Sequence, residues 1–537
     1  MTEWNLASAY EALAAAAPAS PCQRQGERLV TWGAFNARAN ALAADLLGAG
    51  LGHQAKVACY LYNSPEYLEA YLGAFKAGLV PVNTNYRYGS DEVAYLLDNA
   101  DAEAVVFHAG LAPVLAEIRD RLPQVRRWYV VEDGHPTPAW ATRYEAVVAQ
   151  EVEENVQGPW GRTGDDVMLL YTGGTTGLPK GVMWRQADLF EVLGAGGNPV
   201  LGQPRCTDLD EVASRRSFEG LSLLPACPLM HGTGLFTALI ALNGGGCVVT
   251  LEGRRFDPAE LWTTVSTWGV NAVSIVGDAF SRPMLAELQA HPDRYDLSAL
   301  LLIVSSGVMW SSEVKAGLME AIPQVLLWDS LGSSEAVGMA EATAQGGGAQ
   351  ETAQFQVGDH VHVLSEDGRQ VTPGTDEVGM VAISGSIPLG YYKDPDKTAR
   401  SFRTVDGVRY SIPGDYATVG ADGTMHLLGR GSVVINTGGE KVFPEEVEEV
   451  LKCHPSVADA VCVGAPDERF GQVVCAIVEP VGDTSVDPDD LIELVRSRLA
   501  HYKAPRRVVV VPSIERSPAG KVDYPRLVAL AAEQAKA

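Results

Sequence analysis

The sequence has a deficit of positive charge and no paired cysteine motif. Its 537 residues carry 41 Lys and Arg against 67 Asp and Glu, a formal net charge of −26 at pH 7. A negative field of this kind repels nucleic acids and anionic membranes, so any anionic substrate must meet locally positive groups. The eight cysteines form no CxxC pair and have no histidine at metal-ligand spacing, which argues against a cysteine metal site and predicts reduced core thiols.

Long apolar runs are also absent, and no secretory leader is expected. No stretch reaches the roughly 18 consecutive apolar residues that predict a membrane-spanning helix. The first residues, Met-Thr-Glu-Trp-Asn, form neither the basic nor the apolar region of a signal peptide. We therefore expect a cytoplasmic protein with no transmembrane segment and no nucleic-acid partner.

Length and composition predict a folded protein with more than one domain. A single hydrophobic core stops growing at about 250–300 residues, and this chain has 537. With 46% hydrophobic and 20% charged residues, it lies far from the composition of disordered chains. At least two compact units are expected.

The first part of the chain alternates helical patterns with short apolar runs. Helical periodicity covers Ala34–Leu47 and Glu66–Ala77, and strand-like runs cover Lys56–Leu61 and Ala104–Phe107. This alternation predicts βαβ units around a mainly parallel sheet. Later apolar runs continue the pattern at Leu221–Leu224, Cys247–Leu251, Ala272–Val276 and Leu300–Val304.

The pattern changes after a glycine-rich loop at residues 345–350. Shorter runs then alternate with Asp-Gly and Pro-Gly pairs, which favour the hairpins of an antiparallel, β-barrel-like subdomain. From Gly431 a small α+β unit is predicted, with helices at Pro444–Cys453 and Pro488–Leu499 and strands at Val457–Gly464, Gln472–Val478 and Arg507–Val511. The expected fold is therefore α/β, with a large domain of βαβ subdomains and the barrel-like subdomain over residues 1–430 and a small α+β domain over residues 431–537.

One loop carries the strongest chemical signal. The segment Tyr171–Gly181 follows the apolar run Val167–Leu170 and contains four glycines, three threonines and Lys180. Glycine N–H groups can approach an anion closely, while the hydroxyls and the lysine charge add further donors. The loop predicts a phosphate site. It differs from a Walker A loop because Gly181, instead of Ser or Thr, follows Lys180, so a metal ion must be held from elsewhere.

Further motifs follow in a fixed order. They are Pro228-Leu-Met-His231-Gly-Thr-Gly234, Asp329-Ser-Leu-Gly332-Ser-Ser334-Glu335, Gly390-Tyr-Tyr, Gly414-Asp415, Leu428-Gly429-Arg430 and Arg516-Ser-Pro-Ala-Gly520-Lys521. Together with the phosphate loop they resemble the adenylate-forming superfamily of acyl-CoA synthetases, adenylation domains and luciferases, over roughly residues 25–525. The amino-acid sequences of residues 181–185 and 429–446 are most similar to those of bacterial ligases of fatty acids or sterol side-chain acids.

The resemblance implies an ATP site and a magnesium ion. To make an acyl-adenylate, a carboxylate attacks the α-phosphate of ATP and pyrophosphate leaves, so negative charge must be neutralised at one point. By resemblance, Glu335 ligates Mg²⁺ with Thr172 or a neighbouring hydroxyl; the alternative is that Glu335 is a surface carboxylate. By resemblance, Asp415 accepts the ribose hydroxyls beside Arg430; the alternatives are a turn aspartate and a surface arginine. Leu331 stands where the family often has an aromatic residue, so stacking on adenine should be weaker. The implied ATP-binding set is Thr172, Gly173, Gly174, Thr175, Thr176, Gly177, Lys180, Gly307, Val308, Asp329, Leu331, Gly332, Ser333, Ser334, Asp415 and Arg430.

The C-terminal motifs imply a moving lysine and a route for CoA. By resemblance, Lys521 swings in on the small mobile domain to bridge the acyl carboxylate and the α-phosphate, a role that suits a compact cation on a long stem. Gly438 and Gly439, followed by Glu440, resemble the CoA-binding segment beside the pantetheine tunnel, where residues without Cβ admit a chain closely. A surface lysine and a plain turn are the alternatives. The hinge is expected at Gly431 and Ser432, although the family usually has Asp or Lys where this chain has Ser432.

His231 resembles the gate between the nucleotide site and the acyl tunnel, with a core histidine as the alternative. Adenylation domains for amino acids place a carboxylate near this point, and the run His231–Phe236 has none, which favours a plain carboxylic acid. Asp278 would weaken that argument if it faced the pocket instead of capping a helix. The expected acyl pocket consists of His231, Phe280, Met284, Val308, Ala336, Gly338 and Met339.

We therefore expect an acyl-CoA synthetase, an ATP-dependent acid:CoA ligase that converts an apolar carboxylic acid, ATP and CoA into acyl-CoA, AMP and pyrophosphate. The expected catalytic residues are Lys521, Glu335, Thr172 and His231, and a homodimer is compatible with the resemblance. The alternative is a stand-alone adenylation enzyme that loads a carrier protein. A non-catalytic nucleotide-binding module would be expected to lack Lys521 or Glu335.

Overall fold

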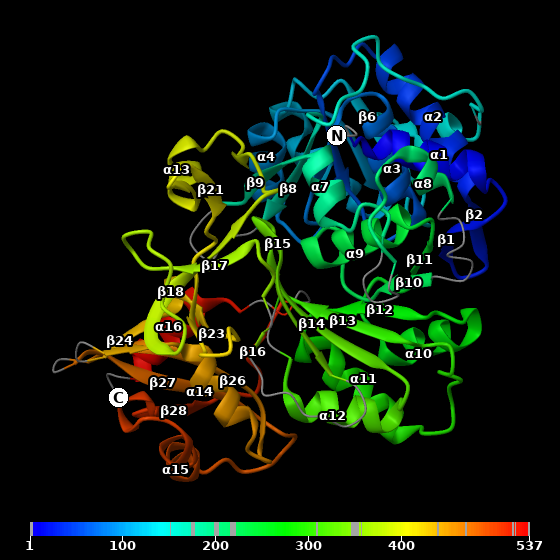
Figure 1. Ribbon diagram of the computed structural model, residues 1–537. Coiled ribbons are helices and arrows are strands. Elements are labelled where there is room, and N and C mark those ends of the chain that lie inside the picture. Colours follow the sequence, from blue (N-terminus) through cyan, green and yellow to red (C-terminus); the bar gives the residue numbers. More distant parts are fainter. Residues whose placement is uncertain are drawn as a thin grey trace.

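Sheets with their covering helices form the framework of the chain (Figure 1). The computed structural model describes residues 4–150, 152–172, 178–197, 203–214, 222–307, 310–344, 354–355, 357–437, 440–467, 470–517, 520 and 522–534. We call the sheets the N-terminal sheet, the middle sheet, the antiparallel sheet and the C-terminal sheet, and their strands are given below.

The N-terminal sheet has the strand order β19-β9-β8-β4-β3-β5-β6-β7. The neighbours β8-β4, β4-β3, β3-β5 and β5-β6 are parallel, whereas β8-β9 is an antiparallel hairpin. The central strands are almost wholly apolar and buried, as expected of parallel strands that helices cover on both faces. The strands are β3 (Lys56–Tyr60), β4 (Val80–Asn83), β5 (Ala102–His108), β6 (Arg127–Val131), β7 (Thr142–Arg143), β8 (Val167–Thr172), β9 (Lys180–Arg185) and β19 (Gly390–Tyr391).

The middle sheet has the order β15-β14-β13-β12-β10-β11-β1-β2. Its inner pairs are parallel from β1 to β14, and antiparallel pairs close both edges, β1-β2 on one side and β14-β15 on the other. The strands are β1 (Pro21–Gln25), β2 (Arg28–Thr31), β10 (Ser222–Pro225), β11 (Cys247–Thr250), β12 (Ala272–Ile275), β13 (Leu302–Ser306), β14 (Leu326–Ser333) and β15 (Ala336–Ala344). The parallel βαβ organisation predicted for the first part of the chain is confirmed.

The helices of these two units cover the sheets; α11 and α12 lie below the middle sheet in Figure 1. Local signals set their ends. The Asn5 side chain accepts hydrogen bonds from the first N–H groups of α1, and Gly269, with φ of +59°, ends α10 in the left-handed conformation. The helices are α1 (Leu6–Ala16), α2 (Trp32–Gly48), α3 (Pro65–Lys76), α4 (Ser90–Asn99), α5 (Ala112–Ile118), α6 (Tyr144–Val148), α7 (Gln186–Val192), α8 (Leu209–Ser214), α9 (Gly232–Asn243), α10 (Pro258–Trp268), α11 (Asp278–Ala290) and α12 (Ser312–Ala321).

The antiparallel sheet follows in sequence, as the Asp-Gly and Pro-Gly pairs predicted. Its order is β16-β23-β22-β18-β21-β20, with β17 paired to β18, and the pairs at residues 406–407 and 422–423 turn the hairpins β20-β21 and β22-β23. Its elements are β16 (Gln354–Phe355), β17 (Val361–Leu364), β18 (Thr375–Ser384), α13 (Pro395–Ser401), β20 (Phe402–Val405), β21 (Val408–Ser411), β22 (Asp415–Val419) and β23 (Met425–Arg430). The glycine-rich loop at 345–350 lies outside the described residues.

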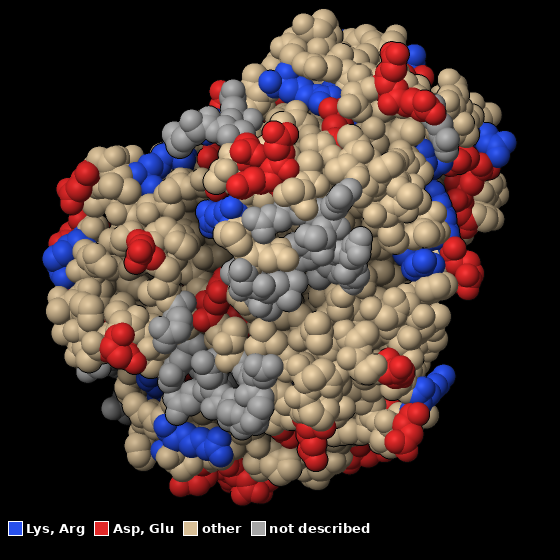
Figure 2. Space-filling view, turned by 45° about the vertical axis from the view of Figure 1, so that its right-hand side comes forward, with Lys and Arg blue, Asp and Glu red and all other residues tan. Residues whose placement is uncertain are grey.

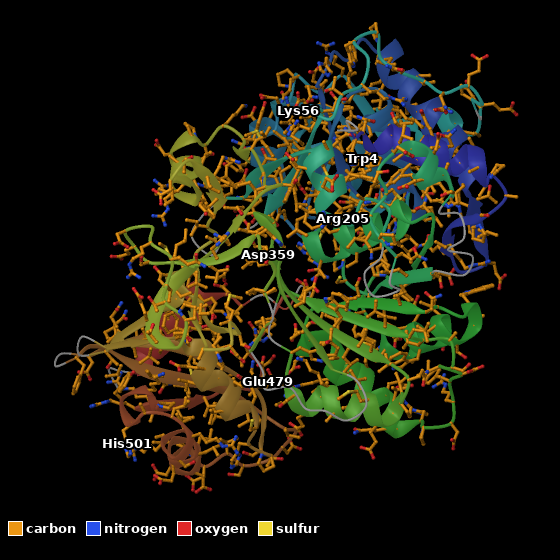
Figure 3. All side chains as sticks on the ribbon, viewed as in Figure 1. Trp4, Lys56, Arg205, Asp359, Glu479 and His501 are labelled. Carbon is orange, nitrogen blue, oxygen red and sulfur yellow. The ribbon has the colours of Figure 1, made fainter. Side chains whose placement is uncertain are left out.

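The C-terminal sheet has the order β25-β24-β27-β26, with β28 parallel to β27. Glu479 on β27, labelled in Figure 3, accepts a hydrogen bond from the Ile514 N–H at 2.7 Å and fixes the segment after β28. The elements are β24 (Ile435–Thr437), β25 (Glu440–Val442), α14 (Pro444–Lys452), β26 (Val457–Asp467), β27 (Gly471–Pro480), α15 (Pro488–Arg498), β28 (Arg507–Val510) and α16 (Tyr524–Gln534). The predicted fold class, two βαβ units and an antiparallel subdomain followed by a small α+β unit, is confirmed.

The cysteines, the surface charge and the helix lengths can be compared with the sequence expectations. Seven of the eight cysteines are buried free thiols, but Cys453, at the end of α14, is exposed, so the expectation of core thiols is wrong there. Acidic side chains are scattered over the face drawn in Figure 2, with basic groups between them. Among the described helices, none combines the length and hydropathy needed to cross a bilayer.

Candidate active site

The phosphate-loop motif lies at the turn of the hairpin β8-β9. Thr172 ends β8 and pairs with Lys180, the first residue of β9, so the two ends of the loop are held side by side. The Lys180 ammonium forms an ion pair with Asp394, at the start of α13, and the hydrogen bond from Lys180 lowers the pKa of the Asp394 carboxyl. The structure therefore shows the loop's predicted cation in contact with a carboxylate.

Glu335 lies at the turn of the hairpin β14-β15, and side chains from other sheets hold this turn. The Trp184 indole N–H donates to the Ser334 carbonyl at 2.9 Å, and the Ser411 hydroxyl donates to the Glu335 carbonyl at 2.6 Å. The Tyr391 hydroxyl donates to the Glu335 carboxylate at Oε1, at 2.6 Å. In the described part of the chain, the buried Ser333 hydroxyl makes no hydrogen bond. The turn thus presents a fixed carboxylate.

The His231 motif packs against this turn. His231 precedes α9, and a Cβ placed on the next residue, Gly232, would lie 3.6 Å from the Ser334 hydroxyl. Thr233 donates to the Ser306 carbonyl at 3.4 Å, beside Gly307, whose φ of +93° favours glycine. Three predicted motifs, around residues 231, 307 and 334, therefore meet at one place.

Asn83, at the end of β4, also belongs to this place, although it was not among the predicted site residues. Its side chain accepts from the Tyr171 N–H at 2.5 Å and donates to the carbonyls of Tyr171 and Met230 at 2.8 and 2.6 Å. Only 2% of Asn83 is exposed, so these bonds are shielded from water. A lone amide after the apolar run Val80–Val82 is the signal that could have indicated it.

The ribose candidates and the adenine candidate Asp329 lie on strands of two different sheets. Asp415 and Arg430 stand opposite each other in the pair β22-β23, so the predicted partnership is present in the backbone register. On β14 the Asp329 carboxylate accepts from the Lys315 ammonium at 2.8 Å, a partner that was not predicted, and burial raises the pKa of Asp329. Lys315 also lies over the Trp310 ring, 5.4 Å from its centre.

The predicted acyl-pocket residues fall into two groups. Phe280 and Met284 are buried in the core between the middle sheet and α10–α12, where Phe280 packs on Phe256 at 4.8 Å between ring centres. Ala336 and Met339, on β15, are buried in the other large core. The structure therefore does not place these four side chains in one apolar cluster.

Gly338 and Asp278, two other residues considered for the acyl pocket, make different contacts. The Gly338 carbonyl lies 3.4 Å from the His360 ring nitrogen. The Asp278 carboxylate accepts from the N–H and hydroxyl of Ser311 at 3.0 and 3.1 Å and from Arg282 at 3.1 Å. Asp278 thus ties the start of α11 to the start of α12.

Several predicted site residues lie in parts of the chain that the structure does not describe, or have only their backbone described. Gly173, Gly174, Thr175, Thr176, Gly177, Val308, Gly438, Gly439 and Lys521 lie outside the described residues. For Arg430, Ser432 and Glu440 the backbone is described. Gly431 and Ser432 lie in the single turn Gly431–Val433 between β23 and β24, where the Gly431 N–H donates to the Gly414 carbonyl at 2.9 Å.

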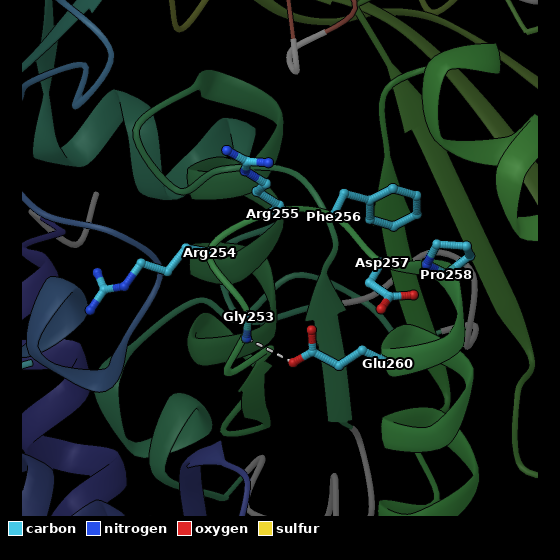
Figure 4. Close-up of a pocket in the computed structure, with 7 residues that line it drawn as sticks. All are labelled: Gly253, Arg254, Arg255, Phe256, Asp257, Pro258 and Glu260. Carbon is cyan, nitrogen blue, oxygen red and sulfur yellow. Dashed lines mark hydrogen bonds between the residues drawn. The ribbon is translucent and has the colours of Figure 1, made fainter. Parts of the chain in front are cut away.

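An open pocket of about 640 Å³ lies elsewhere on the middle sheet, after β11 (Figure 4). Seven consecutive or near-consecutive residues line it: Gly253, Arg254, Arg255, Phe256, Asp257, Pro258 and Glu260. Glu260 accepts from the Gly253 N–H at 2.8 Å, while Arg254 forms an ion pair with Asp133 at 2.9 Å. Of the predicted site residues that the structure describes, none lines this pocket.

Comparisons with known proteins agree with this geometry. The family pattern "AMP-binding enzyme" matches residues 10–392, and the pattern "AMP-binding enzyme C-terminal domain" matches residues 446–521. The chain belongs to the AMP-binding enzyme family. The gap between the two matches contains the predicted domain boundary at 430/431, which stays a prediction.

Curated relatives of this AMP-binding enzyme include CoA ligases. A 3-oxocholest-4-en-26-oate–CoA ligase of Rhodococcus rhodochrous is 42% identical over 508 residues, 93% of this chain and 90% of the relative. A medium/long-chain-fatty-acid–CoA/3-oxocholest-4-en-26-oate–CoA ligase of Mycolicibacterium smegmatis is 39% identical over 97% of this chain and 95% of the relative. The predicted enzyme class, an AMP-forming acyl-CoA ligase that uses ATP and CoA, is therefore confirmed.

Solved structures confirm the fold of the AMP-binding enzyme. An anthranilate CoA ligase in complex with anthranoyl-AMP superimposes with a TM-score of 0.83 at 19% identity, over 100% of this chain and 98% of the other. A benzoate CoA ligase from Burkholderia xenovorans gives a TM-score of 0.81 at 20% identity, over 98% and 100%. These proteins share the arrangement of sheets described above.

Proposed function

We propose that this ligase activates a carboxylic acid with a large apolar body, a sterol side-chain acid first and a medium- or long-chain fatty acid second. The relatives at 42% and 39% identity, which are named for such acids, carry this proposal. The acyl candidates Ala336, Gly338 and Met339, which lie together on β15, are apolar or small, which supports it, since apolar binding depends on such lining. The Asp278 carboxylate is engaged by Ser311 and Arg282, which is consistent with a substrate that carries no ammonium group.

The meeting of the motifs supports the first step. A carboxylate oxygen of the acid attacks the α-phosphorus of ATP, the bond to the bridging oxygen breaks, and pyrophosphate leaves. The phosphates would be bound by Thr172 and Lys180, at the ends of the hairpin, and by the glycines and threonines of residues 173–177. The ribose would be bound by Asp415 with Arg430. The adenine would be bordered by Gly307, Val308, Asp329 and Leu331. Further donors near the phosphates would come from Gly332, Ser333 and Ser334. His231 would separate the nucleotide from the acid.

The donor set near Glu335 fits a magnesium ion that arrives with the nucleotide. Among the described residues there is no cluster of three or more His, Cys, Asp or Glu that could hold a metal ion alone. Magnesium bound with phosphates needs only one or two protein ligands, and the Glu335 carboxylate and the Thr172 hydroxyl are hard oxygen donors. When bound, the ion neutralises charge on the phosphates.

For the second step we propose that the unit 431–537 changes its position about Gly431 and Ser432. Lys521 would serve adenylation in one position, and Gly438, Gly439 and Glu440 would border the CoA thiol in the other. The thiolate attacks the acyl carbon, the acyl–phosphate bond breaks, and AMP leaves. Cytoplasmic location and a homodimer stay predictions.

Two assays test this function. Pyrophosphate release and thioester formation are measured separately over a panel of sterol side-chain, fatty, aryl and amino acids. We expect both products with apolar acids. Thioester formation only with a phosphopantetheinyl carrier protein would favour the carrier-loading alternative instead. Lys521→Ala should lose pyrophosphate release but still transfer a chemically prepared acyl-adenylate to CoA; equal loss of both half-reactions would refute the change of position.

A further inference from the structure

The Glu335 carboxylate is held by a residue that carries no role in the proposed function. The Tyr391 hydroxyl donates to Glu335 Oε1 at 2.6 Å. The other two bonds to this turn, from Trp184 and Ser411, end on backbone carbonyls. Of these three hydrogen bonds, the one from Tyr391 acts on the carboxylate itself, while the other two act on the chain that carries it.

Tyr391 is fixed in place from several sides. It lies on β19, where it pairs with Val182 of β9, and its N–H donates to the Thr398 hydroxyl at 2.9 Å. Its ring contacts Phe402 at 5.9 Å, and the Lys397 ammonium lies 4.8 Å from the ring centre. Only 4% of Tyr391 is exposed. A phenol held in this way can define the direction of the bond it makes.

The residue before it allows this close fit. Gly390 has a φ of +143°, and a Cβ there would collide with Thr398. The glycine therefore lets β19 approach the start of α13, and this approach places the Tyr391 hydroxyl at the Glu335 turn. The same short segment carries Asp394, the partner of Lys180, so β19 and α13 contact both predicted phosphate-site hairpins.

We propose that Tyr391 is a positioning residue that holds Oε1 of Glu335 and leaves Oε2 for the magnesium ion bound with ATP. This inference rests on the proposed role of Glu335. A neutral O–H donor suits the task because it orients the carboxylate without cancelling its charge, as a lysine or arginine would. Groups that orient a metal-ligating carboxylate typically contribute about 10–100-fold in metal affinity or activity.

Equilibrium binding tests the inference without turnover. The probe is α,β-methylene ATP, which cannot release pyrophosphate, titrated by calorimetry with Mg²⁺ and again with EDTA. Wild-type protein should bind it more tightly with Mg²⁺. Tyr391→Phe should lose about tenfold of this magnesium-dependent gain and keep its metal-free affinity within about twofold.

The neighbouring tyrosine provides a matched control. The Tyr392 hydroxyl donates to Asp101 at 2.8 Å, away from Glu335, so Tyr392→Phe removes an equivalent group and should bind like wild type. Glu335→Gln should lose the magnesium-dependent gain. In that background Tyr391→Phe should have no further effect, because the two residues act through one contact.

The outcomes distinguish a failure of the positioning role of Tyr391 from a failure of the metal role of Glu335. If Glu335→Gln loses the gain but Tyr391→Phe keeps it, the positioning role is wrong and the metal role stands. If Glu335→Gln keeps the gain, the metal assignment fails, and the inference with it. An equal loss with and without Mg²⁺ in Tyr391→Phe would mean that the hydroxyl serves the fold, which also overturns the inference.

A second variant covers the case in which Tyr391→Phe is unstable. Glu335→Asp keeps a carboxylate but withdraws it by one methylene from the Tyr391 hydroxyl. It should show the same partial loss of the magnesium-dependent gain in a protein whose tyrosine is intact. Binding equal to wild type would contradict the proposal.

Discussion

The N-terminal sheet and the middle sheet each contain an antiparallel hairpin whose turn carries predicted site residues. In the N-terminal sheet the hairpin β8-β9 carries the phosphate loop, and in the middle sheet the hairpin β14-β15 carries Glu335. The turns are held differently. Side chains of Trp184, Tyr391 and Ser411 bind the Glu335 turn directly, whereas Asn83 binds the phosphate-loop hairpin at Tyr171, ahead of the loop.

This difference matches the ligands expected at the two turns. A metal-ligating carboxylate needs one orientation, which hydrogen bonds to the turn provide. A glycine-rich phosphate loop presents backbone N–H groups, so its ends must be fixed while its middle stays available to the anion. Changes at the Glu335 turn should therefore alter chemistry more than stability, and loss of the Asn83 contacts with Tyr171 should alter stability strongly.

Glu335→Ala should give the largest effect. Loss of the carboxylate should lower pyrophosphate release at least about a hundredfold with every acid, corresponding to roughly 2.7 kcal/mol of barrier. The melting temperature should change little, since the turn keeps its two backbone contacts. The measurement is initial rate against Mg²⁺ concentration; an unchanged rate at all concentrations would remove Glu335 from the site.

Asn83→Ala should have the next largest effect, on folding. It leaves the Tyr171 and Met230 backbone groups without their buried partner, which should cost about 2–3 kcal/mol of unfolding free energy in urea. Asn85→Ala is the control, because Asn85 accepts a hydrogen bond from the Arg87 N–H at an exposed site. Equal losses in the two variants would show that Asn83 is not a special anchor.

Acid should destabilise the N-terminal sheet before the middle sheet. Burial lowers the pKa of His108, at the end of β5, to about 4, and the strands of the middle sheet contain no histidine. An unfolded histidine binds a proton below about pH 6.5, so folding excludes that proton and stability falls as pH drops from about 6.5 to 4. The loss between pH 7 and 5 should be roughly 2 kcal/mol.

Replacement of His108 isolates this contribution. In His108→Asn the pH dependence of unfolding over this range should be shallower than in wild type by that amount. The exposed His501, labelled in Figure 3, gives a control variant, His501→Asn, that should keep the wild-type dependence. If both variants follow the wild-type curve, other groups govern the acid response.

Ser411→Ala should give the smallest effect and sharpen the comparison most finely. It removes the hydroxyl that donates to the Glu335 carbonyl and should cost about 1 kcal/mol of stability. The magnesium-dependent gain in nucleotide affinity should stay within about twofold of wild type. A tenfold loss would show that backbone contacts, and not the carboxylate contact, orient Glu335.

The sequence predicted the elements well because their signals are local. Apolar runs and helical periodicity located strands such as β12 and helices such as α15 to within a residue or two. The family resemblance implied that Arg430 is the partner of Asp415, and the structure places the two residues opposite each other in the pair β22-β23. The contacts of Asn83 and Tyr391 could not be predicted, because each joins segments far apart in the chain and depends on the packing of separate elements. Asp394 was missed for the same reason, since it lies 214 positions from Lys180. The Lys315–Asp329 contact is nearer in sequence, 14 positions, but it depends on how α12 packs beside β14.

Gly431 has a consequence for how relatives of this protein can diverge. The φ of Gly431 is not in the left-handed region, so its backbone conformation does not require a glycine. A Cβ there would collide with the Tyr416 ring, and that ring contacts Phe443 of the following unit at 6.0 Å. A larger residue at 431 should therefore be tolerated only with a smaller one at 416, so we expect the two positions to change together during evolution.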